Sequence, residues 1–186
     1  MVAPEGFEEI IVAMKRSVAA FRAADVPYLL GGSLACWARG GPPPGHDLDF
    51  VVKPEDAERA LAALVETGMR PERPPEGWLL KAWDGDVLVD VIFAPTGLEV
   101  DDEMMVRGDV LRLLAVDTRV MALDDVLASK LLALDEHALD LVGLLGIARA
   151  VREQIDWPAL RARTEHSPFA RAFFTLVEGL DIAGPG

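Results

Sequence analysis

Cysteine and long apolar runs are scarce in this sequence. Among its 186 residues the single cysteine is Cys36, so no internal disulfide can form, and we expect a reducing, cytoplasmic setting. No apolar run approaches the roughly 20 residues needed to span a bilayer. The first apolar stretch contains charges and has no basic segment before it, which is unlike a secretory signal. We therefore expect no membrane partner.

The sequence also contains few positively charged residues. The chain has 18 lysines and arginines against 31 acids, a net charge of −13 and a pI near 4.6. Nonspecific nucleic-acid binding depends on neutralising phosphates, so this balance argues against it. The deficit lies in the first 145 residues, because the remainder has five arginines and five acids. A local basic patch on the C-terminal helices stays open as an alternative.

The chain length allows one compact core, or one domain with a packed helical extension. Apolar periodicity predicts helices over about 7–24, 34–39 and 54–67, and strands over 28–30, 47–52, 78–83 and 87–93. Loops are expected at 40–45 and 71–77, and short strands and turns over 100–122. From residue 123 onward, four helical segments are expected. We predict an α+β fold, with a mixed sheet flanked by helices in residues 1–120 and a helical bundle in residues 121–186.

The first chemical motif is Gly31-Gly32-Ser33, which lies between an expected strand and an expected helix. Glycines at such a junction let the backbone approach a phosphate, and the N–H groups of the turn face the anion. Ser33 adds a hydroxyl and is a suitable N-cap for the short helix. Such a triplet on its own is usually only a turn.

A pair of carboxylates follows on a strand, in Asp47-Leu48-Asp49-Phe50, with 13 residues between Ser33 and Asp47. Residues i and i+2 of a strand share a face, so Asp47 and Asp49 project together while Leu48 and Phe50 face the core. Adjacent carboxylates repel each other unless a cation joins them, and Mg²⁺ prefers such oxygen ligands. Alone, the pair would fit an exposed strand edge, but the order of the two motifs favours a metal platform beside a phosphate cradle.

A third carboxylate, Asp90, lies in the middle of the apolar segment 87–93. Burying a lone carboxylate costs several kcal/mol unless it is paired or bound to metal. An edge strand with a solvated Asp90 is the alternative, and the preceding aspartate pair favours the ligand. Lys81 on the preceding strand could reach the same face, although a solvated lysine is the preferred interpretation.

Leu30-Gly31-Gly32-Ser33 followed by Asp47-Leu48-Asp49-Phe50 resembles the signature of the polymerase-beta-like nucleotidyltransferase superfamily. The resemblance implies that Asp47, Asp49 and Asp90 hold two Mg²⁺ ions, and that Asp90 activates the attacking hydroxyl. It implies that Gly31, Gly32 and Ser33 hold the phosphates of an NTP co-substrate. The expected reaction transfers an NMP to a hydroxyl acceptor with release of pyrophosphate. A non-catalytic member that binds a nucleotide or a partner protein is the alternative.

Lys130 lies within the apolar stripe of the helix expected over 123–134, at a position where leucine would be typical. It either extends to solvent or meets a partner such as Asp140 or a triphosphate. The segment is similar to a helix of toxin-type and antibiotic-type nucleotidyltransferases, in which a lysine faces the nucleotide phosphates. Those relatives continue with further basic residues, whereas this chain continues with Asp135. The acceptor is therefore left open between a small hydroxylated molecule and a tRNA.

The histidines carry weaker signals. His137 and Asp140 are spaced to pair on one helix face, and a structural hydrogen bond is favoured over catalysis. His46 precedes Asp47 and is expected to help close the loop. Cys36 and His166 are expected to be packing or surface residues.

Overall fold

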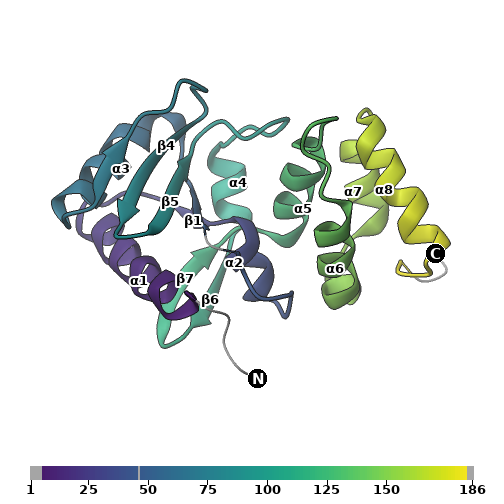
Figure 1. Cartoon of the computed structure of the whole chain (residues 1–186), viewed down its shortest axis with the longest axis horizontal. Coiled ribbons are helices and arrows are strands. Elements are labelled where there is room, and N and C mark those ends of the chain that lie inside the picture. Colours follow the sequence, from purple (N-terminus) through teal and green to yellow (C-terminus); the bar gives the residue numbers. More distant parts are fainter. Residues whose placement is uncertain (1–5, 46, 184–186) are drawn as a thin grey trace.

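The computed structural model describes residues 6–45 and 47–183, and these form one mixed sheet with helices around it (Figure 1). The strands run in the order β3-β4-β5-β2-β1-β7-β6. Their bounds are β1 Leu29–Leu30, β2 Asp47–Val51, β3 Arg70–Glu72, β4 Leu79–Asp84, β5 Val87–Ile92, β6 Asp109–Leu113 and β7 Val116–Val120. β2 pairs in parallel with β5, as β1 does with β7, while the other neighbouring pairs are antiparallel.

The helices have the following bounds: α1 Phe7–Ala23, α2 Gly32–Trp37, η1 Pro54–Asp56, α3 Ala57–Glu66, α4 Asp102–Arg107, α5 Leu123–Leu132, α6 Leu141–Val151, η2 Arg152–Gln154, α7 Trp157–Thr164 and α8 Pro168–Gly179. Figure 1 shows α5 to α8 gathered at one end of the molecule, beyond the sheet. Asp140, Asp156 and Ser167 cap α6, α7 and α8 by accepting backbone N–H bonds. Each cap satisfies one of the donors that a helix start leaves unpaired.

One face of the sheet packs against α1 and α3. The functional side chains of β2 must therefore lie on the opposite face. Leu48 and Phe50 are fully buried, and Phe50 packs edge-on against Phe21 of α1 and against Tyr28. Because side chains alternate along a strand, the intervening Asp47 and Asp49 are placed on the opposite face. The expected orientation of these four residues is confirmed.

The α+β class and the four helical segments after residue 123 are confirmed. Three local predictions were wrong. Residues 102–107 form α4 rather than strand or turn, and Asp101 caps this helix through the backbone N–H of Met104. Residues 70–72, within and beside an expected loop, form the edge strand β3, whose three residues are all exposed and so give no apolar signal. Ser33 is not the N-cap of α2, because the helix already begins at Gly32 and Gly31 takes the cap position.

The change from sheet to helices falls between β7 and α5, and a division into two domains at residue 120 stays a prediction. A single buried apolar cluster runs from Ile10 to Ile182 through both regions. Asp125 of α5 is almost fully buried and forms ion pairs with Arg107 of α4 and Arg163 of α7. No helix within residues 6–45 and 47–183 combines the length and the apolar character needed to cross a membrane.

Candidate active site

The three aspartates singled out from the sequence lie on two neighbouring strands. β2 and β5 run in parallel, and their register places Asp49 directly beside Asp90. Asp47 is exposed, Asp49 is half-buried and Asp90 is only 9% exposed. Parallel neighbours lie about 4.8 Å apart, so in-register side chains on one face are close enough to interact. The sheet thus brings together carboxylates that are about forty residues apart in the chain.

Gly32 sits directly against the carboxylate of Asp49. The turn after β1 is held by a hydrogen bond from the Gly31 N–H to the Asp49 carbonyl oxygen, at 2.8 Å. Gly32 has φ +56°, and a Cβ atom there would lie 1.6 Å from Oδ2 of Asp49. Both the left-handed backbone and the missing side chain are therefore required at this position. The glycine of the motif is needed for the close approach of the turn to an acid, as well as for any approach to a phosphate.

Ser33 joins the start of α2 to the end of the proline-rich loop. Its Oγ accepts a hydrogen bond from the Gly45 N–H at 3.4 Å. The helix α2 packs against both β2 and α5, and this brings Ser33 close to Lys130 on α5. His46, expected to help close this loop, lies outside the described residues.

Negative charge is concentrated around Asp49. Burial, followed by repulsion from Asp47, raises the pKa of Asp49 to about 7, and Lys130 acts in the opposite direction. Burial also raises the pKa of Asp90, while a hydrogen bond from Lys81 lowers it. Both shifts have the sign expected of carboxylates that burial removes from water. A bound cation would favour the ionised forms of both carboxylates and so lower their pKa values.

Lys81 is a site residue that the sequence interpretation assigned to solvent. Its Nζ donates a hydrogen bond to Oδ1 of Asp90 at 3.0 Å, and the side chain is 21% exposed. The two-residue turn Gly85-Asp86 pairs Asp84 with Val87, and the same register places Lys81 opposite Asp90. Counting back from this hairpin turn was the signal that could have identified the pair.

The chemistry of these side chains fits a Mg²⁺ site, although in their present positions they do not converge on a single ion. Three carboxylates on one face of two adjacent strands supply the hard oxygen ligands that Mg²⁺ prefers. Within the described parts of the chain, no three His, Cys, Asp or Glu side chains converge closely enough to share one ion. Asp90 is instead directed to Lys81. Asp47, Asp49 and Asp90 are the side chains that would hold the ion and supply its oxygen ligands.

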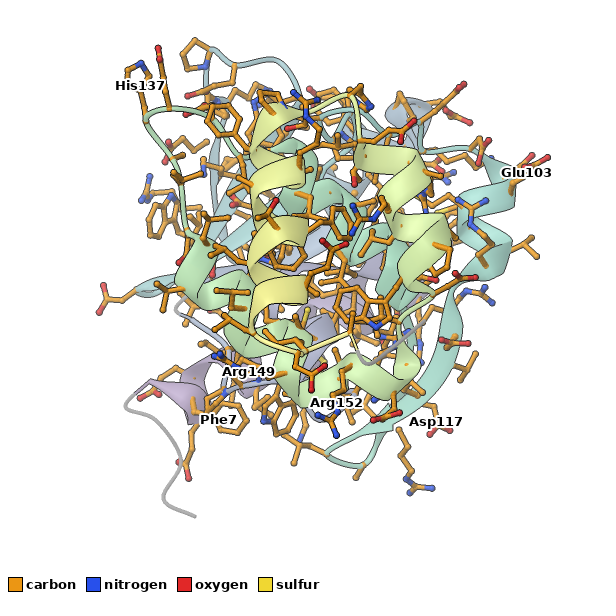
Figure 2. All side chains as sticks on the ribbon, turned by 90° about the vertical axis from the view of Figure 1, so that its right-hand side faces the viewer. Phe7, Glu103, Asp117, His137, Arg149 and Arg152 are labelled. Atoms are coloured by element: carbon orange, nitrogen blue, oxygen red, sulfur yellow. The ribbon has the colours of Figure 1, made fainter. Side chains whose placement is uncertain are left out.

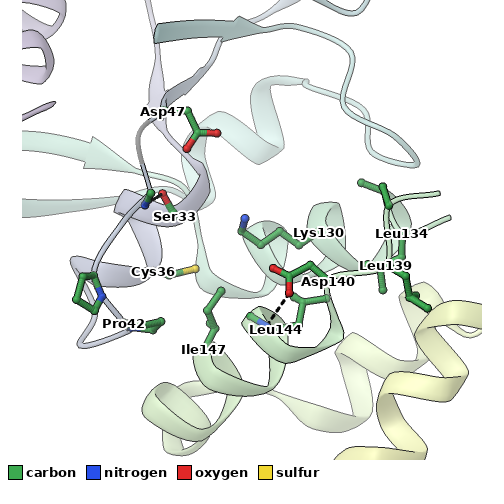
Figure 3. Close-up of a pocket in the computed structure, with 15 residues that line it drawn as sticks. Ser33, Cys36, Pro42, Asp47, Lys130, Leu134, Leu139, Asp140, Leu144 and Ile147 are labelled. Atoms are coloured by element: carbon green, nitrogen blue, oxygen red, sulfur yellow. Dashed lines mark hydrogen bonds between the residues drawn. The ribbon is translucent and has the colours of Figure 1, made fainter. Parts of the chain in front are cut away.

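A cavity of about 570 Å³ opens beside Asp47 (Figure 3). One end carries Ser33, Asp47 and Lys130, and Figure 3 shows Lys130 extending from α5 toward the side on which Ser33 and Asp47 lie. The rest of the wall is mainly apolar and includes Cys36, Pro42, Pro43, Leu134, Leu139, Leu144 and Ile147. Burial raises the pKa of the Cys36 thiol, which favours its neutral form. The cavity thus joins a charged end to an apolar end, as is typical of small-molecule sites.

The predicted pairing of His137 with Asp140 on one helix was wrong. Residues 133–140 form no helix, because α5 ends at Leu132 and α6 begins at Leu141. Asp140 lines the cavity and accepts the N–H of Gly143 at 2.8 Å as the cap of α6. His137 contacts Glu136 instead, and Figure 2 shows it at the outer edge of the molecule. His137 and Asp140 therefore lie in separate surroundings, and the contacts of each are structural.

Comparison with known proteins places the fold. No family model matches the sequence, and no curated protein matches it. Among solved structures, the chain is similar to ANT(2")-Ia in complex with adenylyl-2"-tobramycin, at 15% identity. That match covers 89% of this chain and 97% of the other, with a TM-score of 0.63.

Two further structures share the same architecture. An antigenic nucleotidyltransferase-like protein from Paracoccidioides brasiliensis is 11% identical, over 96% of this chain and 90% of the other, with a TM-score of 0.54. The lincomycin-bound lincosamide antibiotic adenylyltransferase LnuA is 11% identical, over 78% of this chain and 96% of the other, with a TM-score of 0.50. The chain therefore has the nucleotidyltransferase fold, and the resemblance drawn from its motifs is confirmed at the level of the fold.

Proposed function

We propose that this protein is a Mg²⁺-dependent nucleotidyltransferase that transfers an NMP from an NTP to a hydroxyl group. The observation that carries the proposal is the in-register placement of Asp49 and Asp90 beside Gly32, with Asp47 on the same strand as Asp49. Three carboxylates on adjacent strands, of which Asp47 also lines the cavity, suit a reaction whose difficulty is the charge on phosphate oxygens. The nucleotidyltransferase fold of the chain supports the same assignment.

Each residue of the site has a role in the proposed reaction. Gly31, Gly32 and Ser33 hold the β- and γ-phosphates with Lys130, whose ammonium group neutralises their charge. The acceptor oxygen forms a bond to the α-phosphorus while the bond from that phosphorus to the bridging oxygen breaks, and pyrophosphate leaves. Asp90 accepts the proton of the acceptor hydroxyl, a role to which a raised pKa is suited. When bound to Asp47, Asp49 and Asp90, two Mg²⁺ ions would stabilise the charge on the attacking and leaving oxygens.

The acceptor is proposed to be a small hydroxylated molecule. A tRNA would need cationic side chains free to meet phosphates. Yet Arg152 pairs with Glu153, Arg161 with Glu178 and Arg163 with Asp125, while Arg171 donates to backbone carbonyls. Most of the arginines that could form a C-terminal basic patch are thus already engaged within the chain. Arg149 and Arg152 are labelled at the surface in Figure 2, and the protein as a whole has a net charge of −13.

The cavity supports the same choice of acceptor. Its volume of about 570 Å³ lies within the range of small-ligand pockets, roughly 300–1,000 Å³. ANT(2")-Ia and LnuA are both described with an antibiotic or its adenylylated product bound. The proposed acceptor of this chain is a small molecule of the same type.

The test is transfer from an NTP labelled at the α-phosphate, with Mg²⁺, against a panel of aminoglycosides, lincosamides and total tRNA. Asp49→Asn should reduce transfer by about a thousandfold, because a metal ligand supplies several kcal/mol to the transition state. Asp86→Asn, in the exposed hairpin turn, is the matched control and should transfer at the normal rate. Undiminished transfer by Asp49→Asn would overturn the assignment.

A non-catalytic nucleotide-binding protein of the same fold is the second candidate. The specific observation in its favour is that Asp90 is bound to Lys81 and does not converge with the other two acids. Calorimetry combined with the transfer assay separates the two functions, because a non-catalytic protein would bind NTP with Mg²⁺ but label no acceptor. Label on a small acceptor would exclude it.

A further inference from the structure

A row of charged side chains crosses four strands on the face that carries the site. Register pairs Glu72 of β3 with Lys81 of β4, Lys81 with Asp90 of β5, and Asp90 with Asp49 of β2. We call these four residues the charged row. Its order of signs is acid, base, acid, acid, so Lys81 is the one cation between acids on both sides.

Lys81 is committed to Asp90 rather than shared. Its Nζ lies 3.0 Å from Oδ1 of Asp90, and the two side chains are only 21% and 13% exposed. Glu72, on the other side, accepts a hydrogen bond from the indole N–H of Trp83 at 2.8 Å. A partly desolvated ion pair with a hydrogen bond is stronger than an exposed one, since water screens it less. The pair is therefore a defined feature of the site.

We propose that Lys81 is a positioning residue that acts as a resident cation for Asp90. Its ammonium group directs the carboxylate of Asp90 toward β4 rather than toward Asp47 and Asp49. It also bonds an oxygen of Asp90 that would otherwise help to bind a divalent ion. A metal ion must displace Lys81 to recruit Asp90. The nucleotide assists this exchange, because its phosphates add negative charge beside the carboxylates. The complete metal site therefore forms only when NTP is present.

This inference rests on the proposed function for the identity of the ion, and it makes a separate prediction. Without Lys81, the carboxylates carry one more uncompensated negative charge, so they should bind a divalent ion more tightly before nucleotide arrives. The expected gain is about tenfold, because a unit charge a few ångströms from the ion is only partly screened at such a site. A lysine with a purely structural role would not change metal affinity in this direction.

The experiment measures Mn²⁺ binding to the full chain without nucleotide, by electron paramagnetic resonance of the free ion. Lys81→Met should bind Mn²⁺ about tenfold more tightly than the wild type, and Lys81→Arg should remain within about twofold because it keeps the charge. Lys15→Met, which removes an exposed lysine of α1, is the matched control and should behave as the wild type. Lys81→Gln serves the same purpose if the methionine variant fails to fold.

The outcomes separate this inference from the proposed function. Equal Mn²⁺ affinity in Lys81→Met and the wild type, with Asp49→Asn losing the ion, would refute the role of Lys81 and leave transferase activity standing. Tighter binding by Lys81→Met in a protein that labels no acceptor would support the resident cation and refute the transferase. With a non-hydrolysable NTP analogue present, the difference between Lys81→Met and the wild type should shrink. A difference that persists unchanged would refute the exchange.

Discussion

Replacing Gly32 with alanine should disable the site while leaving the fold largely intact. Alanine at φ +56° costs about 1–2 kcal/mol of folding free energy, because its Cβ crowds the following carbonyl in the left-handed region. The same Cβ would lie 1.6 Å from Oδ2 of Asp49, which is impossible without displacement. The carboxylate must therefore move by more than an ångström, a misplacement that can cost about a hundredfold in rate.

The measurement combines Mn²⁺ binding, labelled transfer and urea unfolding for Gly32→Ala. The matched control is Gly85→Ala in the hairpin turn, where φ is +62° and an added Cβ meets no atom within 4 Å. Both variants should lose about 1–2 kcal/mol of stability, but only Gly32→Ala should lose metal binding and transfer. Equal loss of function in the two variants, or normal metal binding by Gly32→Ala, would show that the contact with Asp49 has no functional role.

Three further predictions follow from the same structure. Asp125→Ala should lower the free energy of unfolding by about 1–3 kcal/mol, because it removes the charge-assisted hydrogen bonds that join α5 to Arg107 and Arg163; a urea midpoint close to that of the wild type would contradict this. Asp49, with a folded pKa of about 7 against an ordinary 3.8, should make the metal-free protein less stable as pH rises from 4 through 7. Melting curves should show this loss of stability in the wild type but not in Asp49→Asn. In addition, Mn²⁺ affinity should fall as pH drops below about 7, because the ion requires the ionised carboxylate. Lys130→Ala should weaken NTP binding about tenfold in calorimetry, the effect of losing one charge-assisted hydrogen bond; unchanged affinity would remove Lys130 from the phosphate site.

Much of the fold could be predicted because its signals are local. The apolar spacing of α1 and the caps of the C-terminal helices depend on residues within one or two turns of each other. Elements without such signals were missed. β3 is an exposed edge strand whose residues carry no alternation, and its existence depends on pairing with β4. The helix α4 spans six residues, which is too short for an apolar period to show.

The sequence by itself determined which aspartates and glycines supply the candidate site. Alternation along β2 places Asp47 and Asp49 on one face, and the glycine at position 32 meets the steric demand of its turn. Only the tertiary structure decided how these parts meet. It made β5 the parallel neighbour of β2, and it brought Lys130 to the cavity through the packing of α2 on α5. The physical reason is that strand order and helix docking are set by burial of apolar surface across the whole chain, and no local spacing encodes it.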